Sequence, residues 1–194
     1  MDHYFSATPQ APSEERDVLL QVLGEEIRCT TDRAVFASRG LDEGTRILLE
    51  CVEVPHAARL LDLGAGWGAI AVTLGVHYGC EVLCVERNER AAGLCQRNLE
   101  RNKVRGRVLV GDGFAPVAGE RVDLITLNPP IRAGKSVYYP WLEEAKQYLR
   151  PGGALWVVVR TTQGAKSLER ELWAHYDTVR EVEIKRGYRV YSAR

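Results

Sequence analysis

The feature that most constrains the fold is a regular alternation of two patterns, which begins near residue 45. Short apolar runs alternate with longer segments in which apolar residues recur at helical spacing. The expected strands are 59–64, 81–86, 107–112, 121–128 and 154–160, and the expected helices are 46–54, 69–78, 88–104, 138–150 and 166–176. Strands that alternate with helices form crossover units, so the pattern predicts an α/β fold with a parallel sheet covered on both faces.

The end of the chain departs from this alternation. Residues 178–194 have the pattern of two strands with a turn near Gly187 and no helix between them, which predicts an antiparallel hairpin. The complete expectation is a doubly wound, mostly parallel seven-stranded sheet with an antiparallel C-terminal hairpin. The tripeptide Pro-Gly-Gly at 151–153 is expected to stop the helix 138–150.

A length of 194 residues suits one well-packed domain. Residues 1–40 are expected to form an N-terminal arm with one or two lead-in strands, packed on a main domain that spans 41–194. The N-terminus shows no basic start followed by an apolar run, and no stretch approaches the roughly 20 apolar residues of a membrane span. The expectation is therefore a cytoplasmic protein without a membrane partner, either a monomer or a homodimer.

The charges balance, because 26 basic residues face 26 acidic ones. This argues against a strongly basic nucleic-acid binder, although local patches survive a neutral sum. Two basic clusters are expected to be mainly solvated surface: Arg97, Arg101, Lys103, Arg105 and Arg107 form one, and Lys185, Arg186, Arg189 and Arg194 form the other. The five cysteines include no C-x-x-C pair and have no histidine at zinc spacing, so no metal site is expected.

A glycine loop, DLGAGWG at 62–68, follows an expected strand and opens an expected helix. Glycine lets the backbone turn tightly and approach a ligand closely. The spacing is G-x-G-x-G with an acid two residues before it, unlike the G-x-G-x-x-G of pyrophosphate-binding loops. Glu86, which ends the next strand, is placed to accept hydrogen bonds from ribose hydroxyls, and Asp112 with Gly113 is placed to bind an adenine amino group. These features predict a nucleoside cofactor at the carboxyl edge of the sheet.

A second motif, Asn128-Pro129-Pro130, ends the fourth strand of the sheet. Proline has no backbone N–H, so this strand end presents carbonyl oxygens and one side-chain amide oxygen. Such acceptors suit an amine whose lone pair is delocalised, as in guanine, adenine or a glutamine amide. The amide oxygen of Asn128 and the carbonyl of Pro129 would accept its two hydrogens and turn the lone pair towards the group to be transferred.

The motifs DLGAGWG, VERN, GDGF and NPPIRAGK together resemble the methyltransferase small domain, the catalytic module of bacterial ribosomal RNA guanine-N2 methyltransferases. The resemblance covers nearly the whole chain. It implies a class I, Rossmann-like methyltransferase fold, S-adenosyl-L-methionine as the cofactor, and the exocyclic N2 amine of a guanine in ribosomal RNA as the acceptor. We predict as cofactor-binding residues Asp62, Gly64, Gly66, Trp67, Glu86, Asp112, Gly113 and Asn128, and as acceptor-orienting residues Asn128, Pro129, Pro130 and Ile131. Phe36 and Thr45 are expected to close one wall.

The sequence departs from the family pattern where an aromatic residue usually follows the two prolines and stacks on a flipped-out base, because Ile131 stands there. Four other aromatic residues could supply the missing ring: Trp67, Tyr138, Tyr139 and Trp141. A core or surface position is favoured for each of them. The larger ribosomal RNA enzymes carry an additional N-terminal domain, so docking is expected to use the 1–40 arm, the loop after Pro130 or an oligomer.

Arg132 and Lys135 in the loop after Pro130 are predicted to contact substrate phosphate, with a solvated basic loop as the alternative. Two other enzyme functions stay open at this point, namely a protein glutamine N5-methyltransferase and a small-molecule N-methyltransferase. A cofactor-binding module without activity is disfavoured, since such a module has no use for the Asn128 loop.

Overall fold

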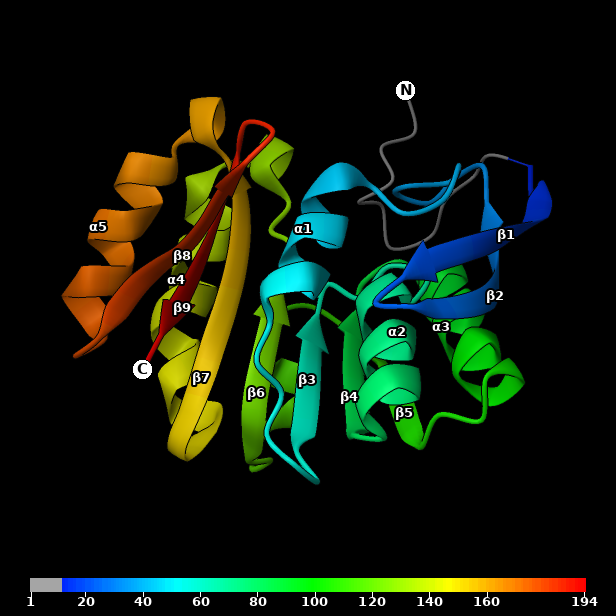
Figure 1. Cartoon of the computed structure of the whole chain (residues 1–194), viewed down its shortest axis with the longest axis horizontal. Helices are drawn as coiled ribbons and strands as arrows, with labels where there is room; N and C mark the ends of the chain where they lie inside the picture. The colour runs from blue at the N-terminus through cyan, green and yellow to red at the C-terminus, as the bar shows by residue number, and fades with distance from the viewer. Residues whose placement is uncertain (1–11) are drawn as a thin grey trace.

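The computed structural model describes residues 12–194, and its main feature is a seven-stranded sheet with the order β5-β4-β3-β6-β7-β9-β8 (Figure 1). The strands are β3 (Arg59–Leu63), β4 (Glu81–Glu86), β5 (Gly106–Val110), β6 (Val122–Leu127), β7 (Leu149–Arg160), β8 (Val179–Lys185) and β9 (Tyr188–Ala193). The first five are parallel to one another, whereas β9 lies antiparallel between β7 and β8. The predicted doubly wound sheet and its antiparallel C-terminal hairpin are thereby confirmed.

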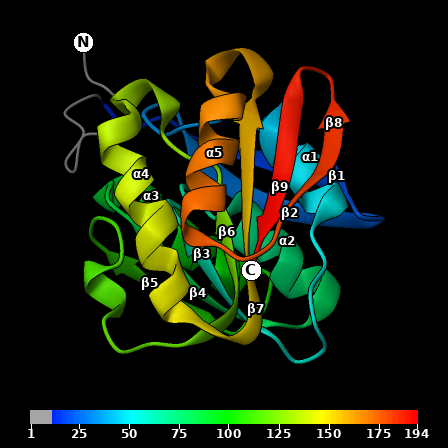
Figure 2. The same cartoon turned by 90° about the vertical axis from the view of Figure 1, so that its left-hand side faces the viewer.

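Helices cover both faces of this sheet (Figures 1 and 2). They are α1 (Glu43–Cys51), α2 (Ala69–Tyr78), α3 (Glu89–Arg101), α4 (Lys135–Ala145) and α5 (Ala165–His175). Successive residues of a strand point to opposite faces. In β3, Leu60 therefore packs in the core shared with α1, α2 and α3, whereas Leu61 and Leu63 pack in the core shared with α4 and α5. Burial on both faces explains why the central strands are apolar throughout.

The predicted boundaries of the fourth helix were wrong. α4 begins at Lys135 and ends at Ala145, and a 3-10 turn then leads directly into β7. The Pro-Gly-Gly segment at 151–153 does not stop the helix but lies within β7, where the pairing with β6 changes register. A bulge of this kind accommodates a proline, which cannot donate to a regular ladder of hydrogen bonds.

The N-terminal part of the described chain forms a separate antiparallel hairpin of β1 (Glu15–Val22) and β2 (Glu25–Asp32) beside α2 and α3 (Figure 1). Leu23 and Gly24 connect the two strands with φ angles of 55° and 78°. Positive φ at both positions is the geometry that two-residue hairpin turns favour. Residues 1–11 of the expected N-terminal arm lie outside the described residues.

The buried side chain of Asn98 on α3 attaches this hairpin to the main domain. Its Oδ1 accepts a hydrogen bond from the backbone N–H of Thr30 at 2.7 Å. Its Nδ2 donates to the carbonyl oxygens of Thr30 and Trp67, each at 2.8 Å. One amide therefore satisfies both backbone groups of a β2 residue and one carbonyl of the glycine loop, which is how buried polar groups avoid the cost of desolvation.

Within residues 12–194, no helix is long and apolar enough to cross a membrane. In the same part of the chain, no group of three or more histidine, cysteine, aspartate or glutamate side chains is arranged to hold a metal ion. The five cysteines are free thiols, and all but Cys51 are buried.

Candidate active site

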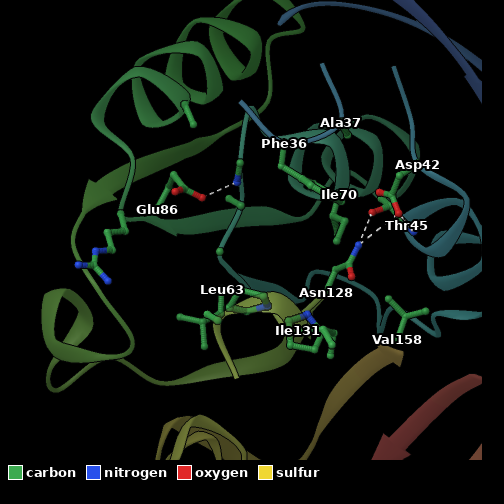
Figure 3. A pocket seen from close by; sticks show the side chains of 18 of the residues that line it. Phe36, Ala37, Asp42, Thr45, Leu63, Ile70, Glu86, Asn128, Ile131 and Val158 are labelled. Carbon is green, nitrogen blue, oxygen red and sulfur yellow. Dashed lines mark hydrogen bonds between the residues drawn. The ribbon is translucent and has the colours of Figure 1, made fainter. Parts of the chain in front are cut away.

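The structure contains a pocket of about 520 Å³ at the carboxyl ends of the parallel strands (Figure 3). Its wall comes from the glycine loop, the ends of β4, β6 and β7, and the segment that precedes α1. Ligands of open α/β sheets bind at this edge, and the volume is within the range of small-molecule sites. The predicted residues that line the pocket are Phe36, Thr45, Gly64, Gly66, Trp67, Glu86, Asp112, Gly113, Asn128, Pro129, Pro130, Ile131 and Arg132.

The glycine loop exposes its backbone to this pocket. Gly64 and Gly66 have φ angles of 75° and 57°, and a Cβ atom built on either would meet no atom within 4 Å. The backbone N–H groups of Gly64 and Ala65 both donate to the carbonyl of Val85, at 2.8 and 3.1 Å, which fixes the turn against β4. Gly68 has a different role, because a Cβ there would approach the Sγ of Cys95 to 2.8 Å. The first two glycines thus leave room for a ligand and the third allows close packing of α3.

Glu86, at the end of β4, holds the loop from the side. Its Oε2 accepts from the N–H of Gly66 at 2.7 Å and its Oε1 accepts from the N–H of Asn88 at 2.8 Å (Figure 3). Burial raises the pKa of this carboxyl, and backbone hydrogen bonds from Asn88, Gly66 and Arg87 oppose that shift. A carboxylate has about four lone-pair sites, so the Glu86 side chain keeps acceptor capacity for a ligand hydroxyl.

Asp112 and Gly113 lie farther along the same wall. The Asp112 carboxylate is exposed and lies 3.6 Å from the Nη1 of Arg87. Gly113 has a φ of 57°, and a Cβ there would approach the indole nitrogen of Trp141 to 2.8 Å. Trp141 therefore contributes a ring at this end of the pocket, next to the predicted adenine contact.

Asp62 does not line the pocket, although it belongs to the motif. It is 1% exposed and lies beneath the loop, where Oδ1 accepts from the hydroxyl of Thr126 at 2.9 Å and Oδ2 accepts from the N–H of Ala71 at 3.2 Å. Burial raises the pKa of this carboxyl to about 7, despite those two hydrogen bonds. Its observed contacts join β3, β6 and the first turn of α2. This arrangement organises the loop from behind.

Asn128 follows β6 and faces the segment before α1 across the pocket (Figure 3). Its Nδ2 donates to the hydroxyl of Thr45 at 2.9 Å and lies 3.5 Å from Oδ1 of Asp42. Both hydrogen-bonding hydrogens of the amide are thereby directed towards α1, and the amide oxygen is left for another donor. The carbonyl of Pro129 already accepts from the N–H of Ile131 at 2.8 Å, so a single lone pair remains on it.

Of the four rings named as possible replacements for the usual aromatic residue, Trp67 and Trp141 line the pocket, whereas Tyr138 and Tyr139 do not, in agreement with the core or surface positions favoured for them. Tyr138 is 1% exposed in the core and Tyr139 does not line the pocket, whereas Trp67 is 2% exposed and donates from its indole to the carbonyl of Phe36 at 3.1 Å. Phe36 itself lines the pocket and is 45% exposed. Tyr188, which the sequence motifs do not indicate, also lines it. No local signal marks Tyr188, because it reaches the pocket only through the antiparallel pairing of β9 with β7.

Of the two predicted phosphate contacts, only Arg132 lines the pocket. Lys135 points towards α5, where its Nζ donates to the hydroxyl of Ser167 at 2.6 Å and lies 5.6 Å from the ring centroid of Tyr139. Arg160 at the end of β7 is a second lining arginine, whose Nε donates to the hydroxyl of Tyr188 at 3.0 Å.

Most of the two basic clusters is engaged with acidic side chains. Arg97 and Arg101 pair with Glu15 and Asp17 of the N-terminal hairpin. The other pairs are Arg107 with Glu120, Lys185 with Glu50, Arg186 with Glu43, Arg189 with Glu181 and Arg194 with Glu53. These ion pairs reduce the positive charge that the two clusters could offer to phosphate. The arginines at the pocket rim are the better candidates for phosphate contacts.

A parallel sheet ending in an antiparallel pair, with a glycine loop and an acid at the next strand end, defines the class I S-adenosylmethionine-dependent methyltransferases. The chain belongs to the methyltransferase small domain family, whose model matches residues 26–192. The protein YbxB of Bacillus subtilis (strain 168) is 31% identical over 197 residues, with 100% of this chain and 98% of that protein covered.

Ribosomal RNA methyltransferases are among the other similar proteins. Ribosomal RNA small subunit methyltransferase C of Alcanivorax borkumensis is 32% identical over 162 residues, which cover 80% of this chain and 49% of that protein. The structure of a T. thermophilus 16S rRNA N2 methyltransferase (RsmC) in complex with AdoMet and guanosine matches with a TM-score of 0.85 at 28% identity, covering 95% of this chain and 52% of that one. The chain therefore spans about half the length of these two relatives.

Proposed function

We propose that this methyltransferase transfers a methyl group to the exocyclic N2 amine of a guanine in ribosomal RNA. The observation that carries the proposal is the state of Asn128: its amide nitrogen is engaged by α1 while its amide oxygen is left to accept from a substrate amine. The similarity to the T. thermophilus enzyme, which was crystallised with guanosine, supports guanine as the acceptor.

The pocket residues fit S-adenosylmethionine. Gly64 and Gly66 leave an open cradle in which a Cβ would meet no other atom, and Glu86 borders that cradle with a carboxylate that keeps acceptor capacity. We infer that Glu86 binds the ribose hydroxyls and that Asp112, Gly113 and neighbouring groups hold the adenine. When bound, the cofactor supplies a methyl group on a positively charged sulfonium.

The residues of the chain would then position the acceptor. Asn128 Oδ1 accepts one hydrogen of the guanine amine and the remaining lone pair of the Pro129 carbonyl accepts the other, which directs the nitrogen lone pair into the pocket. This alignment is a proximity effect and needs no strong base before attack, since the proton can leave afterwards. Among the described pocket-lining residues there is no histidine, consistent with a mechanism that relies on orientation.

RNA would dock at the rim through Arg132 and Arg160, which line the pocket from two different segments. Binding of a short single-stranded RNA should therefore weaken steeply with salt, with a slope that falls by about 0.7 for each phosphate contact removed. We expect this loss for Arg132→Gln and Arg160→Gln. Arg180→Gln serves as the control. Arg180 stands opposite Ser192 in the β8–β9 register, at the end of the ladder away from Tyr188, and it does not line the pocket.

The experiment that tests the proposal measures transfer from methyl-labelled S-adenosylmethionine to total RNA, total protein and extracted metabolites. We expect label in RNA, and N2-methylguanosine after digestion to nucleosides. Label in a protein glutamine would instead support the glutamine N5-methyltransferase, and label in a metabolite would support the small-molecule enzyme. The Asn128→Ala variant controls for transfer by a contaminating activity.

A further inference from the structure

The contact between Asn128 and the start of α1 carries an inference beyond the assignment of the acceptor. An asparagine amide has nearly the same shape in its two flipped orientations, but only one of them presents an oxygen to a substrate amine. The alternative would present an NH2 group, which repels a donor. The usefulness of Asn128 therefore depends on what selects its orientation.

The hydroxyl of Thr45 does not make this selection by itself. It lies 2.9 Å from Nδ2 of Asn128, and a hydroxyl can either accept from an NH2 group or donate to an amide oxygen. The carboxylate of Asp42 breaks the symmetry because it has acceptors alone, and its Oδ1 lies 3.5 Å from the same nitrogen. An amide oxygen at that place would face a like-charged oxygen.

The same carboxylate oxygen also fixes the position of Thr45. Asp42 is the N-cap of α1, and its Oδ1 accepts from the backbone N–H groups of Gly44 at 3.1 Å and of Thr45 at 3.2 Å. Thr45 is 4% exposed, so its hydroxyl has little competition from water. One carboxylate thus holds both the helix start and the group that contacts Asn128.

We propose that Asp42 and Thr45 are positioning residues that lock the Asn128 amide with its oxygen towards the acceptor amine. This inference rests on the proposed function, because it assumes an amine acceptor at Asn128. In this proposal, the start of α1 decides whether the oxygen or the NH2 group of Asn128 faces the substrate. Asn128 lies more than eighty positions later in the chain.

Three substitutions test this assignment. Thr45→Val keeps the shape of the side chain but removes the hydroxyl, and we expect kcat to fall about tenfold, the equivalent of one hydrogen bond. Thr45→Ser restores the hydroxyl and should recover most of the rate. Asp42→Asn keeps a good N-cap but is no longer acceptor-only, so kcat should fall several-fold while the melting temperature stays near that of the parent.

Two controls separate positioning from general damage. Thr73→Val makes the same change at a buried threonine of α2 that does not line the pocket, and its rate should equal that of the parent. In the Asn128→Ala background, Thr45→Val should have no further effect on the rate, because the group through which it acts is gone. A further tenfold loss in that background would overturn the proposal.

A measurement without turnover keeps the inference separate from the identity of the substrate. The side-chain amide resonances of Asn128 can be assigned by their absence in the Asn128→Ala spectrum of the nitrogen-15-labelled protein. We expect them to shift and to exchange faster with solvent in Thr45→Val, and to remain near the parental values in Thr45→Ser and Thr73→Val. Unchanged resonances in Thr45→Val would refute the lock. Changed resonances in a protein that does not methylate RNA would retain the lock and refute the proposed substrate.

Discussion

Replacing Asn98 by alanine should detach the N-terminal hairpin from α3. The side chain is 1% exposed and makes three hydrogen bonds, two to the backbone of Thr30 and one to the carbonyl of Trp67. Alanine offers none of them, and the part-buried backbone N–H and carbonyl of Thr30 on β2 would lose these partners. The substitution therefore tests whether one amide couples the hairpin to the glycine loop.

The expected cost follows from the number of bonds. A hydrogen bond contributes about 0.5–1.5 kcal/mol net, so three of them give about 3 kcal/mol of unfolding free energy. For a domain of this size, that loss corresponds to a fall in melting temperature of about 6–12 °C. Asn98→Asp should also destabilise near neutral pH, because a carboxylate keeps the acceptor for Thr30 but places charge against two carbonyl oxygens.

Urea unfolding followed by circular dichroism gives the free energy, and hydrogen exchange of the β2 amides locates the loss. Arg101→Ala is the matched control, because it removes exposed contacts between α3 and the same hairpin, namely the ion pair with Asp17 of β1 and a hydrogen bond to the hydroxyl of Thr30. It should cost less than about 1 kcal/mol. If Asn98→Ala changed stability by less than about 0.5 kcal/mol, as an ordinary surface substitution does, the coupling would not exist.

Three further outcomes are expected. Asn128→Ala should lower kcat on the order of a hundredfold at an unchanged melting temperature, and a parental rate in a methyl-transfer assay would refute the orienting role. Glu86→Ala should weaken cofactor binding by about 1.5–3 kcal/mol in calorimetry and also lower the melting temperature, because Gly66 loses its acceptor; unchanged affinity would remove Glu86 from the site. The pKa of Asp62, raised by burial from an ordinary value of 3.8 to about 7, means that the folded state keeps a proton which the unfolded chain releases. The stability of the parent relative to Asp62→Asn should therefore decrease by up to about 4 kcal/mol as the pH rises from about 4 to about 8, and parallel pH profiles would contradict this.

The fold was predictable because its signals are local. The central strands are buried on both faces, so each is a short apolar run, and the turns that follow β3 and β6 are marked by glycine and proline. The boundary of α4 was not predictable in this way. The Pro-Gly-Gly segment has the composition of a helix stop, yet the strand beside it tolerates the bulge.

The sequence predicts which pocket residues stand at the ends of strands, but it does not predict the contacts between different elements. The motifs predicted that Glu86 and Asn128 lie at the ends of strands of the sheet, and both line the pocket, whereas the contact of Asn128 with Asp42 joins elements that no local pattern connects. The same limit explains the basic clusters. The acids that engage them, such as Glu15 and Glu50, lie on distant elements, so the sequence shows the charge but not its neutralisation.

The position of β9 has a consequence for the order in which the molecule assembles. β8 precedes β9 in the chain, yet within residues 12–194 it pairs with β9 alone, so its place in the sheet depends on the docking of β9 on β7. Until then β7 presents an open edge, which is the part of a nascent sheet most prone to pair with other chains. Arg186 and Gly187 connect β8 to β9 with φ angles of 49° and 79°, the geometry that lets a two-residue turn bring β9 back alongside β8. Because Tyr188 belongs to β9, the wall of the pocket is incomplete until that strand has docked.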